Sequence, residues 1–180
     1  MSSFLTNFVQ NQINFGFTGL FPTTTFKQKS TNSITNSVGQ MYTPFSLYAQ
    51  TSLLKDVKLG LGIYTPFGSG VNYPIDWTGR YILNEIELQT VYFQPSLSFK
   101  LSKQLSIGGG FIYSVGNVLL EKNLPLSSTS YSEEASAQLK GNGEGLGYNL
   151  GTYYKPNDKF SLGVTYHSKV IMKLKDGEAN

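Results

Sequence analysis

The sequence predicts an all-β fold, an antiparallel meander of about seven long strands that form part of a transmembrane β-barrel. Three observations support this prediction. Apolar residues alternate with small or polar ones along most of the chain, with a period of two. Most alternating segments exceed the about 5–6 residues of an ordinary strand and match the about 9–11 residues that cross a bilayer. The connections between them alternate between short and long, as they do in outer-membrane barrels.

In each predicted strand the apolar residues occupy every second position and so share one face, which we call the apolar parity. The fourth is the clearest, because Val91, Phe93 and Leu97 alternate with Tyr92, Gln94 and Ser98. In the seventh, the apolar parity ends on Val170, whereas His167 and Lys169 share the polar parity. The seven predicted strands cover residues 13–21, 45–53, 57–64, 90–101, 105–116, 146–154 and 160–170.

The connections predict an orientation as well as a fold. Those at 54–56, 102–104 and 155–158 are short, whereas those at 27–41, 67–85 and 121–138 are long. Short periplasmic turns and long extracellular loops would make the odd-numbered strands run outward. A soluble β-sandwich is the alternative, since its strands also have one dry and one wet face. Such a sandwich seldom has strands this long or loops so regularly segregated.

The composition fits a surface between lipid and a crowded lumen. Only 14 % of residues are charged and 39 % are hydrophobic, while the chain has 19 Gly, 12 Tyr and 12 Phe. The net charge of +3 is not concentrated in a basic run, which argues against nucleic acid. The absence of cysteine excludes disulfides and thiolate sites. We expect no cofactor and no metal, because no ligand spacing is present.

No catalytic constellation emerges, so we do not expect an enzyme. The sole histidine, His167, shares its predicted inward face with Thr165 and Lys169 and has no nucleophile and orienting partner beside it. The glycine-rich run at 141–145 lacks the Lys-Ser/Thr pair and the strand-to-helix setting of a phosphate loop. A lumenal polar residue and a flexible strand explain these two features better.

Two longer motifs resemble a known family. Residues 76–81 read DWTGRY, ahead of the fourth strand. Residues 145–156 read GLGYNLGTYYKP and lead through a short turn into FSLGVTYHSKV at 160–170. Together, and in this order, they resemble the FadL (OMPP1/FadL/TodX) family of outer-membrane transporters for long-chain fatty acids and other hydrophobic compounds.

The resemblance implies a fourteen-stranded barrel with an N-terminal plug in the outer membrane of a Gram-negative bacterium. The chain at 1–180 is then a single partial barrel domain, and we expect the plug, the signal peptide and the C-terminal barrel half to be absent from it. Its expected partners are hydrophobic small molecules, outer-membrane lipids, and the missing plug and barrel half. We expect no nucleic-acid partner.

The resemblance also implies passive transport through a lumenal pocket and a lateral opening at a kinked third strand. Gly60, Gly62 and Pro66 are the candidates for that opening, because Gly and Pro interrupt ladder pairing. Inward-facing glycines could instead make room for the plug. The candidate substrate-binding residues are Phe67, Tyr73, Trp77, Arg80 and Tyr81. An interfacial aromatic belt with loop packing is the alternative for this set.

Three functions remain to be distinguished. The first is uptake of hydrophobic molecules such as fatty acids. The second is a structural or adhesive barrel without transport. The third is a lipid-modifying enzyme, which the missing catalytic constellation disfavours.

Overall fold

A computed structural model describes residues 11–128 and 131–179, which form strands joined by turns. No helix in these residues is long and apolar enough to cross a membrane. The strands are β1 (Gln12–Phe17), β2 (Thr25–Lys27), β3 (Ile34–Asn36), β4 (Phe45–Leu54), β5 (Val57–Tyr64), β6 (Gly68–Asn72), β7 (Glu85–Lys100), β8 (Leu105–Ser128), β9 (Tyr131–Asn157), β10 (Phe160–His167) and β11 (Ile171–Ala179).

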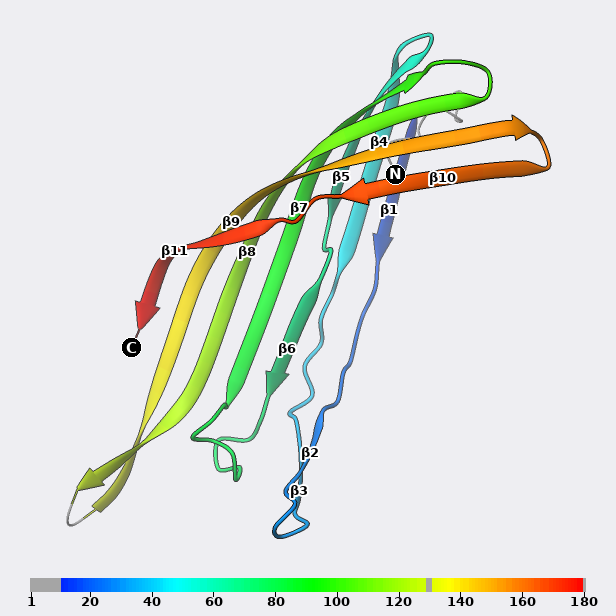
Figure 1. Cartoon of the computed structure of the whole chain (residues 1–180). Helices are drawn as coiled ribbons and strands as arrows, with labels where there is room; N and C mark the ends of the chain where they lie inside the picture. The colour runs from blue at the N-terminus through cyan, green and yellow to red at the C-terminus, as the bar shows by residue number, and fades with distance from the viewer. Residues whose placement is uncertain (1–10, 129–130, 180) are drawn as a thin grey trace.

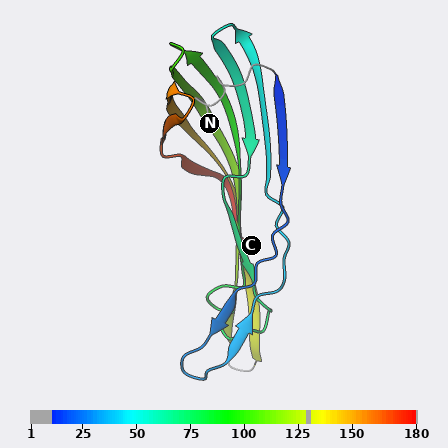
Figure 2. The same ribbon diagram turned by 90° about the vertical axis from the view of Figure 1, so that its right-hand side faces the viewer.

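The main sheet is an antiparallel meander in the order β1-β4-β5-β7-β8-β9-β10, which confirms the seven predicted strands. β6 also pairs with β7 and β11 with β9, while β2 and β3 form a separate hairpin. The short turns lie at one end of the sheet and the longer connections at the other (Figure 1). Viewed along the sheet, the strands curve into an open trough with β1 on one side and the β9–β10 hairpin on the other (Figure 2).

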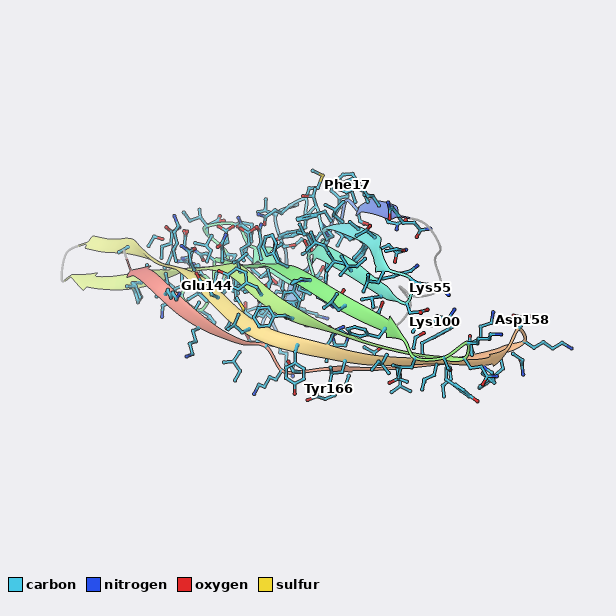
Figure 3. All side chains as sticks on the ribbon, turned by 90° about the horizontal axis from the view of Figure 1, so that it is seen from above. Phe17, Lys55, Lys100, Glu144, Asp158 and Tyr166 are labelled. Carbon is cyan, nitrogen blue, oxygen red and sulfur yellow. The ribbon has the colours of Figure 1, made fainter. Side chains whose placement is uncertain are left out.

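The apolar parity lies on the exposed, convex face of the trough. Leu150, Val164 and Tyr166 are 55 %, 61 % and 57 % exposed, and Tyr166 projects from that outer side (Figure 3). The opposite parity is buried although it is polar, with Ser98 and Ser114 fully covered. Within the described residues no second sheet packs on the apolar parity, so the structure excludes the β-sandwich alternative. Exposed apolar bands facing outward are what a bilayer requires.

Residues 121–128 and 131–138, which were predicted to lie in a loop, belong to strands. β8 and β9 are 24 and 27 residues long and stay paired from Leu105↔Tyr154 to Ser128↔Tyr131. The prediction failed here because it took polar residues as the mark of a loop. A strand that extends beyond the bilayer has water on its outer face, so it needs no apolar outer parity to remain a strand.

The third and seventh strands are each interrupted by one extra residue. Tyr64 pairs with Tyr92 and Gly68 with Gln89. The chain therefore advances four residues on the third strand while its neighbour β7 advances three. β10 and β11 repeat this pattern against β9 around Ser168. One extra residue flips every following side chain to the other face. Val170 therefore lies on the inner face, over Gly147, rather than with the outward set where the alternation placed it.

Candidate functional site

The inner face in the membrane-spanning part is built from small and polar side chains. Cross-strand partners form rows around the trough, such as Gln50–Gly60–Ser96–Gly110–Asn149. Several glycines of the inner face are tightly surrounded, since an added Cβ would lie 2.9 Å from the carbonyl oxygen of Pro95 at Gly110 and 2.8 Å from that of Gln89 at Gly116. These positions bring neighbouring strands and side chains close together on the inner face. The row that includes Gly110 therefore keeps the wall thin and polar.

An aromatic row crosses this inner face near the interruption of the third strand. Tyr48, Tyr64 and Tyr92 lie on β4, β5 and β7, with adjacent ring centroids 5.7 Å apart. Phe67, in the interruption itself, meets Tyr92 edge-on at 6.2 Å. The hydroxyl of Tyr64 donates a hydrogen bond to Oε1 of Gln94 at 2.7 Å. This row gives an otherwise polar wall an apolar surface with hydroxyl groups along it.

Beside the row, Gly60 and Gly62 leave a hollow that Tyr48, Gln94 and Ser96 also line. Its volume is about 20 Å³, room for about one water molecule rather than for an acyl chain. Both glycines belong to a continuous ladder, since each pairs with β4 and with β7. Of the three residues predicted for a lateral opening, Pro66 alone lies at the interruption itself.

The wall splits between the second and third strands at this interruption. The Thr65 amide donates to the Phe45 carbonyl at 3.0 Å, and the Val38 amide donates to the Asn72 carbonyl at 2.7 Å. Between these two bonds, no backbone hydrogen bond joins the described residues 39–44 to 66–71. Tyr42 bonds instead to Leu20, and its side chain covers Gly70. A side chain rather than a ladder therefore fills this stretch of wall.

Above the membrane-spanning part, the inner face becomes apolar. Leu88 pairs with Val118 and Val118 with Gly141, and Ile86, Leu120 and Leu139 form the next row. We call these side chains, with Val71 opposite Ile86 on β6, the inner apolar strip. A Cβ on Gly141 would be 3.4 Å from Val118, which shows that both occupy one face. The strip lines the inner face of the extension on the same side as the polar lumen wall.

The outer face at the same height is charged. Glu85 is directly opposite Glu121, and Ser136 and Gln138 donate hydrogen bonds to the Glu121 carboxylate. Burial, and then the negative charges of Glu121 and Glu87, raise the pKa of Glu85. The polarity of the two faces is thus the reverse of that in the membrane-spanning part. The inner apolar strip is therefore backed by an acidic outer face.

Two of the five predicted binding residues form the core of a loop. Tyr73 and Trp77 are each only 8 % exposed and stack at 4.1 Å. Phe26 of the β2–β3 hairpin contacts Trp77 edge-on at 5.3 Å, and the indole donates to the Leu83 carbonyl at 2.8 Å. These contacts fix the loop at 73–84 against the β2–β3 hairpin. Tyr73 and Trp77 therefore have a structural role in this conformation.

The other three predicted residues lie elsewhere. Arg80 stacks over the Tyr81 ring at 4.5 Å and donates to the Tyr81 hydroxyl at 3.0 Å and to the Trp77 carbonyl at 3.3 Å. Phe67 belongs to the aromatic row instead. The structure thus divides the predicted set among a loop core, an adjacent cation–tyrosine pair and the lumenal wall.

The described residues contain no group of three or more His, Asp or Glu that could hold a metal ion. His167 ends β10, where it pairs with Asn149, and the glycine-rich run at 141–145 is a regular part of β9.

Comparison with known proteins decides the family. A family model described as "outer membrane protein transport protein (OMPP1/FadL/TodX)" matches residues 1–180. The chain belongs to this family. Its localisation is therefore the outer membrane of a Gram-negative bacterium, as the resemblance implied.

Two known proteins are similar to this FadL-family chain. An outer membrane protein of Neisseria meningitidis serogroup B is 28 % identical over 152 residues, which cover 72 % of this chain and 32 % of that protein. The crystal structure of a Pseudomonas aeruginosa FadL homologue matches with a TM-score of 0.66 at 19 % identity, over 89 % of this chain and 42 % of that one. The chain thus spans about a third to two fifths of the length of these relatives, and the second likeness concerns the fold.

The sequence offered a signal for the residues that the prediction missed. Tyr48, Tyr64 and Tyr92 are large residues on the parity that otherwise carries Gly, Ser and Gln, so each interrupts the small-residue pattern at a related height. The inner apolar strip had a signal too, because alternation continues through 117–121 with its polarity reversed.

Proposed function

We propose that this FadL-family chain forms part of a passive route for hydrophobic small molecules, such as fatty acids, across the outer membrane. The observation that carries the proposal is the reversal of polarity along the strands. Below, the apolar face is outside and meets lipid, whereas above, the apolar face is inside. An apolar strip facing inward on the extracellular side gives a hydrophobic molecule a favourable surface, at about 25 cal/mol per Å² of apolar area covered.

Within this proposal the strip is the capture surface, together with Phe67, Arg80 and Tyr81. The strip continues downward to the aromatic row at Tyr92, because Leu88 and Tyr92 share the inner parity of β7. A molecule could therefore pass from one apolar surface to the next without facing the charged outer side. Tyr73 and Trp77 support this arrangement by holding the loop.

Replacing Leu120 with glutamine should weaken binding of a fluorescent fatty acid to the complete protein about tenfold. The reason is that losing partial burial of one leucine costs about 1–1.5 kcal/mol. Leu119→Gln is the matched control, since the neighbouring side chain points to the outer face at the same height. Binding measured by fluorescence titration should change little in the control. Equal losses in both variants, or in neither, would remove the capture surface from the inner face.

The split in the wall at Pro66 is the proposed lateral exit. Its two ends are bonded at Phe45 and Asn72, and the Tyr42 side chain covers the stretch between. Moving a side chain requires no ladder hydrogen bonds to break, so this stretch opens at lower cost than any paired part of the sheet. Gly60 and Gly62 lie just below it on the inner face.

Closing the split should stop uptake. The chain has no cysteine, so Tyr42→Cys with Gly70→Cys allows a reducible bifunctional thiol cross-linker to bridge it. We expect uptake of labelled fatty acid into cells to fall on cross-linking and to recover on reduction. The control pair, Thr51→Cys with Leu59→Cys, lies in the intact β4–β5 ladder and should have no effect. Undiminished uptake through the cross-linked split would place the exit elsewhere.

A further inference from the structure

Near the short turns, the inner face holds a buried cation that no described residue satisfies. Lys58 of β5 is only 8 % exposed, and its ammonium has no hydrogen-bond partner. Its cross-strand partner on β7 is Ser98, which is fully buried and whose hydroxyl also lacks a partner. Two unsatisfied donors therefore stand opposite each other on the lumenal wall.

The surroundings increase the need for an anion. Lys100, one inward position further along β7, adds a second positive charge to the same face. The ion pairs among the described residues are Lys155–Asp158 and Lys175–Glu144, so neither lysine belongs to one. The nearest acid in sequence, Asp56, is exposed in the turn. A buried ammonium without a counter-charge is destabilising, and a bound anion would offset that cost.

The inner positions beside these two donors are occupied by glycine. Gly60 follows Lys58 on the inner parity of β5, and Gly108 is the cross-strand partner of Ser98 on β8. The donor set, one ammonium and one hydroxyl with a second ammonium nearby, suits a carboxylate, whose two oxygens accept charge-assisted hydrogen bonds.

We propose that Lys58 and Ser98 form a carboxylate-binding site on the lumenal wall at the turn end of the barrel. The carboxylate is either the head group of an amphiphilic substrate or an acidic side chain of a polypeptide segment in the lumen. The first source rests on the proposed function, whereas the second does not. The site lies on the inner face of the same sheet as the aromatic row, several residues closer to the turns, and is separate from the capture surface.

Lys58→Met in the complete protein tests the site, because methionine keeps much of the side chain's apolar length without its charge. The control is Lys103→Met, an exposed turn lysine at the same end of the sheet. Binding of laurate and of the neutral dodecanol is measured by displacement of a fluorescent probe. Thermal unfolding of the ligand-free protein is measured in parallel.

A substrate carboxylate predicts about tenfold weaker laurate binding with unchanged dodecanol binding. A polypeptide carboxylate predicts a lower unfolding temperature without ligand, since its charge is left buried and unpaired. If instead unfolding is unchanged or shifts upward and both affinities persist, Lys58 has no anionic partner and the site is overturned. Ser98→Ala should reproduce the pattern at smaller amplitude and serves if Lys58→Met fails to assemble. Failure of the wild type to bind either compound would defeat the proposed function but leave the unfolding test valid.

Discussion

Replacing Leu150 with arginine should lower the free energy of unfolding of the complete protein in lipid vesicles by about 2–4 kcal/mol. Leu150 is 55 % exposed on the convex face of β9, midway along the part that crosses the membrane. In the native state the guanidinium would lie against lipid chains, where no water or counter-charge solvates it. The loss should appear in a urea titration as an earlier midpoint with the same slope.

Thr165→Arg is the matched control for this change. Thr165 lies on β10 and pairs with Gly151, next to Leu150 in sequence and on the inner face. A charge there meets the lumen, so the midpoint should stay within about 0.5 kcal/mol of the wild type. Equal destabilisation by the two variants would contradict the assignment of the convex face to lipid.

The second large effect should come from Trp77→Ala. Removing a buried indole typically costs about 3–5 kcal/mol, and here it also removes the stack on Tyr73, the edge contact with Phe26 and the hydrogen bond to Leu83. We expect the loop at 73–84 to lose protection while the membrane-spanning strands keep theirs. Amide hydrogen exchange followed by mass spectrometry resolves the two regions.

Ile75→Ala tests whether the effect is specific to the loop core. Ile75 belongs to the same loop but is 71 % exposed, so its truncation should change loop protection little. Fatty-acid binding should fall in Trp77→Ala as a consequence of the loosened loop. If Trp77→Ala leaves exchange unchanged yet abolishes binding, then Trp77 contacts the ligand directly and its structural role is secondary.

The strands were predictable because the residues of one parity must be apolar along the whole length that faces lipid. The alternation of Val91, Phe93 and Leu97 leaves no helical alternative, and short turns such as 102–104 fix the neighbours. The same rule failed above the membrane, where Glu121 and the residues after it were predicted as a loop and are strand. It also failed at Val170, because an extra residue in a strand leaves no mark in the alternation until the partner strand is known.

The candidate site was less predictable than the fold. Aromatic residues in a long connection were identified as a group, but sequence spacing could not show that Trp77 turns into a loop core while Phe67 joins Tyr92. Nor could it show that Gly60 and Gly62 stay in the ladder and that the split begins only after Thr65. Such assignments depend on which strand each residue meets, and pairing is a property of the folded sheet.

The β8–β9 hairpin also has a consequence for how the chain assembles. Its register runs without interruption from Ser128↔Tyr131 back to the short turns, so each new pair closes next to one already formed. Zipping of this kind has a low contact order and should be fast. We therefore expect the hairpin to form as a unit before it enters the bilayer, and to serve as the template on which β7 and β10 then align.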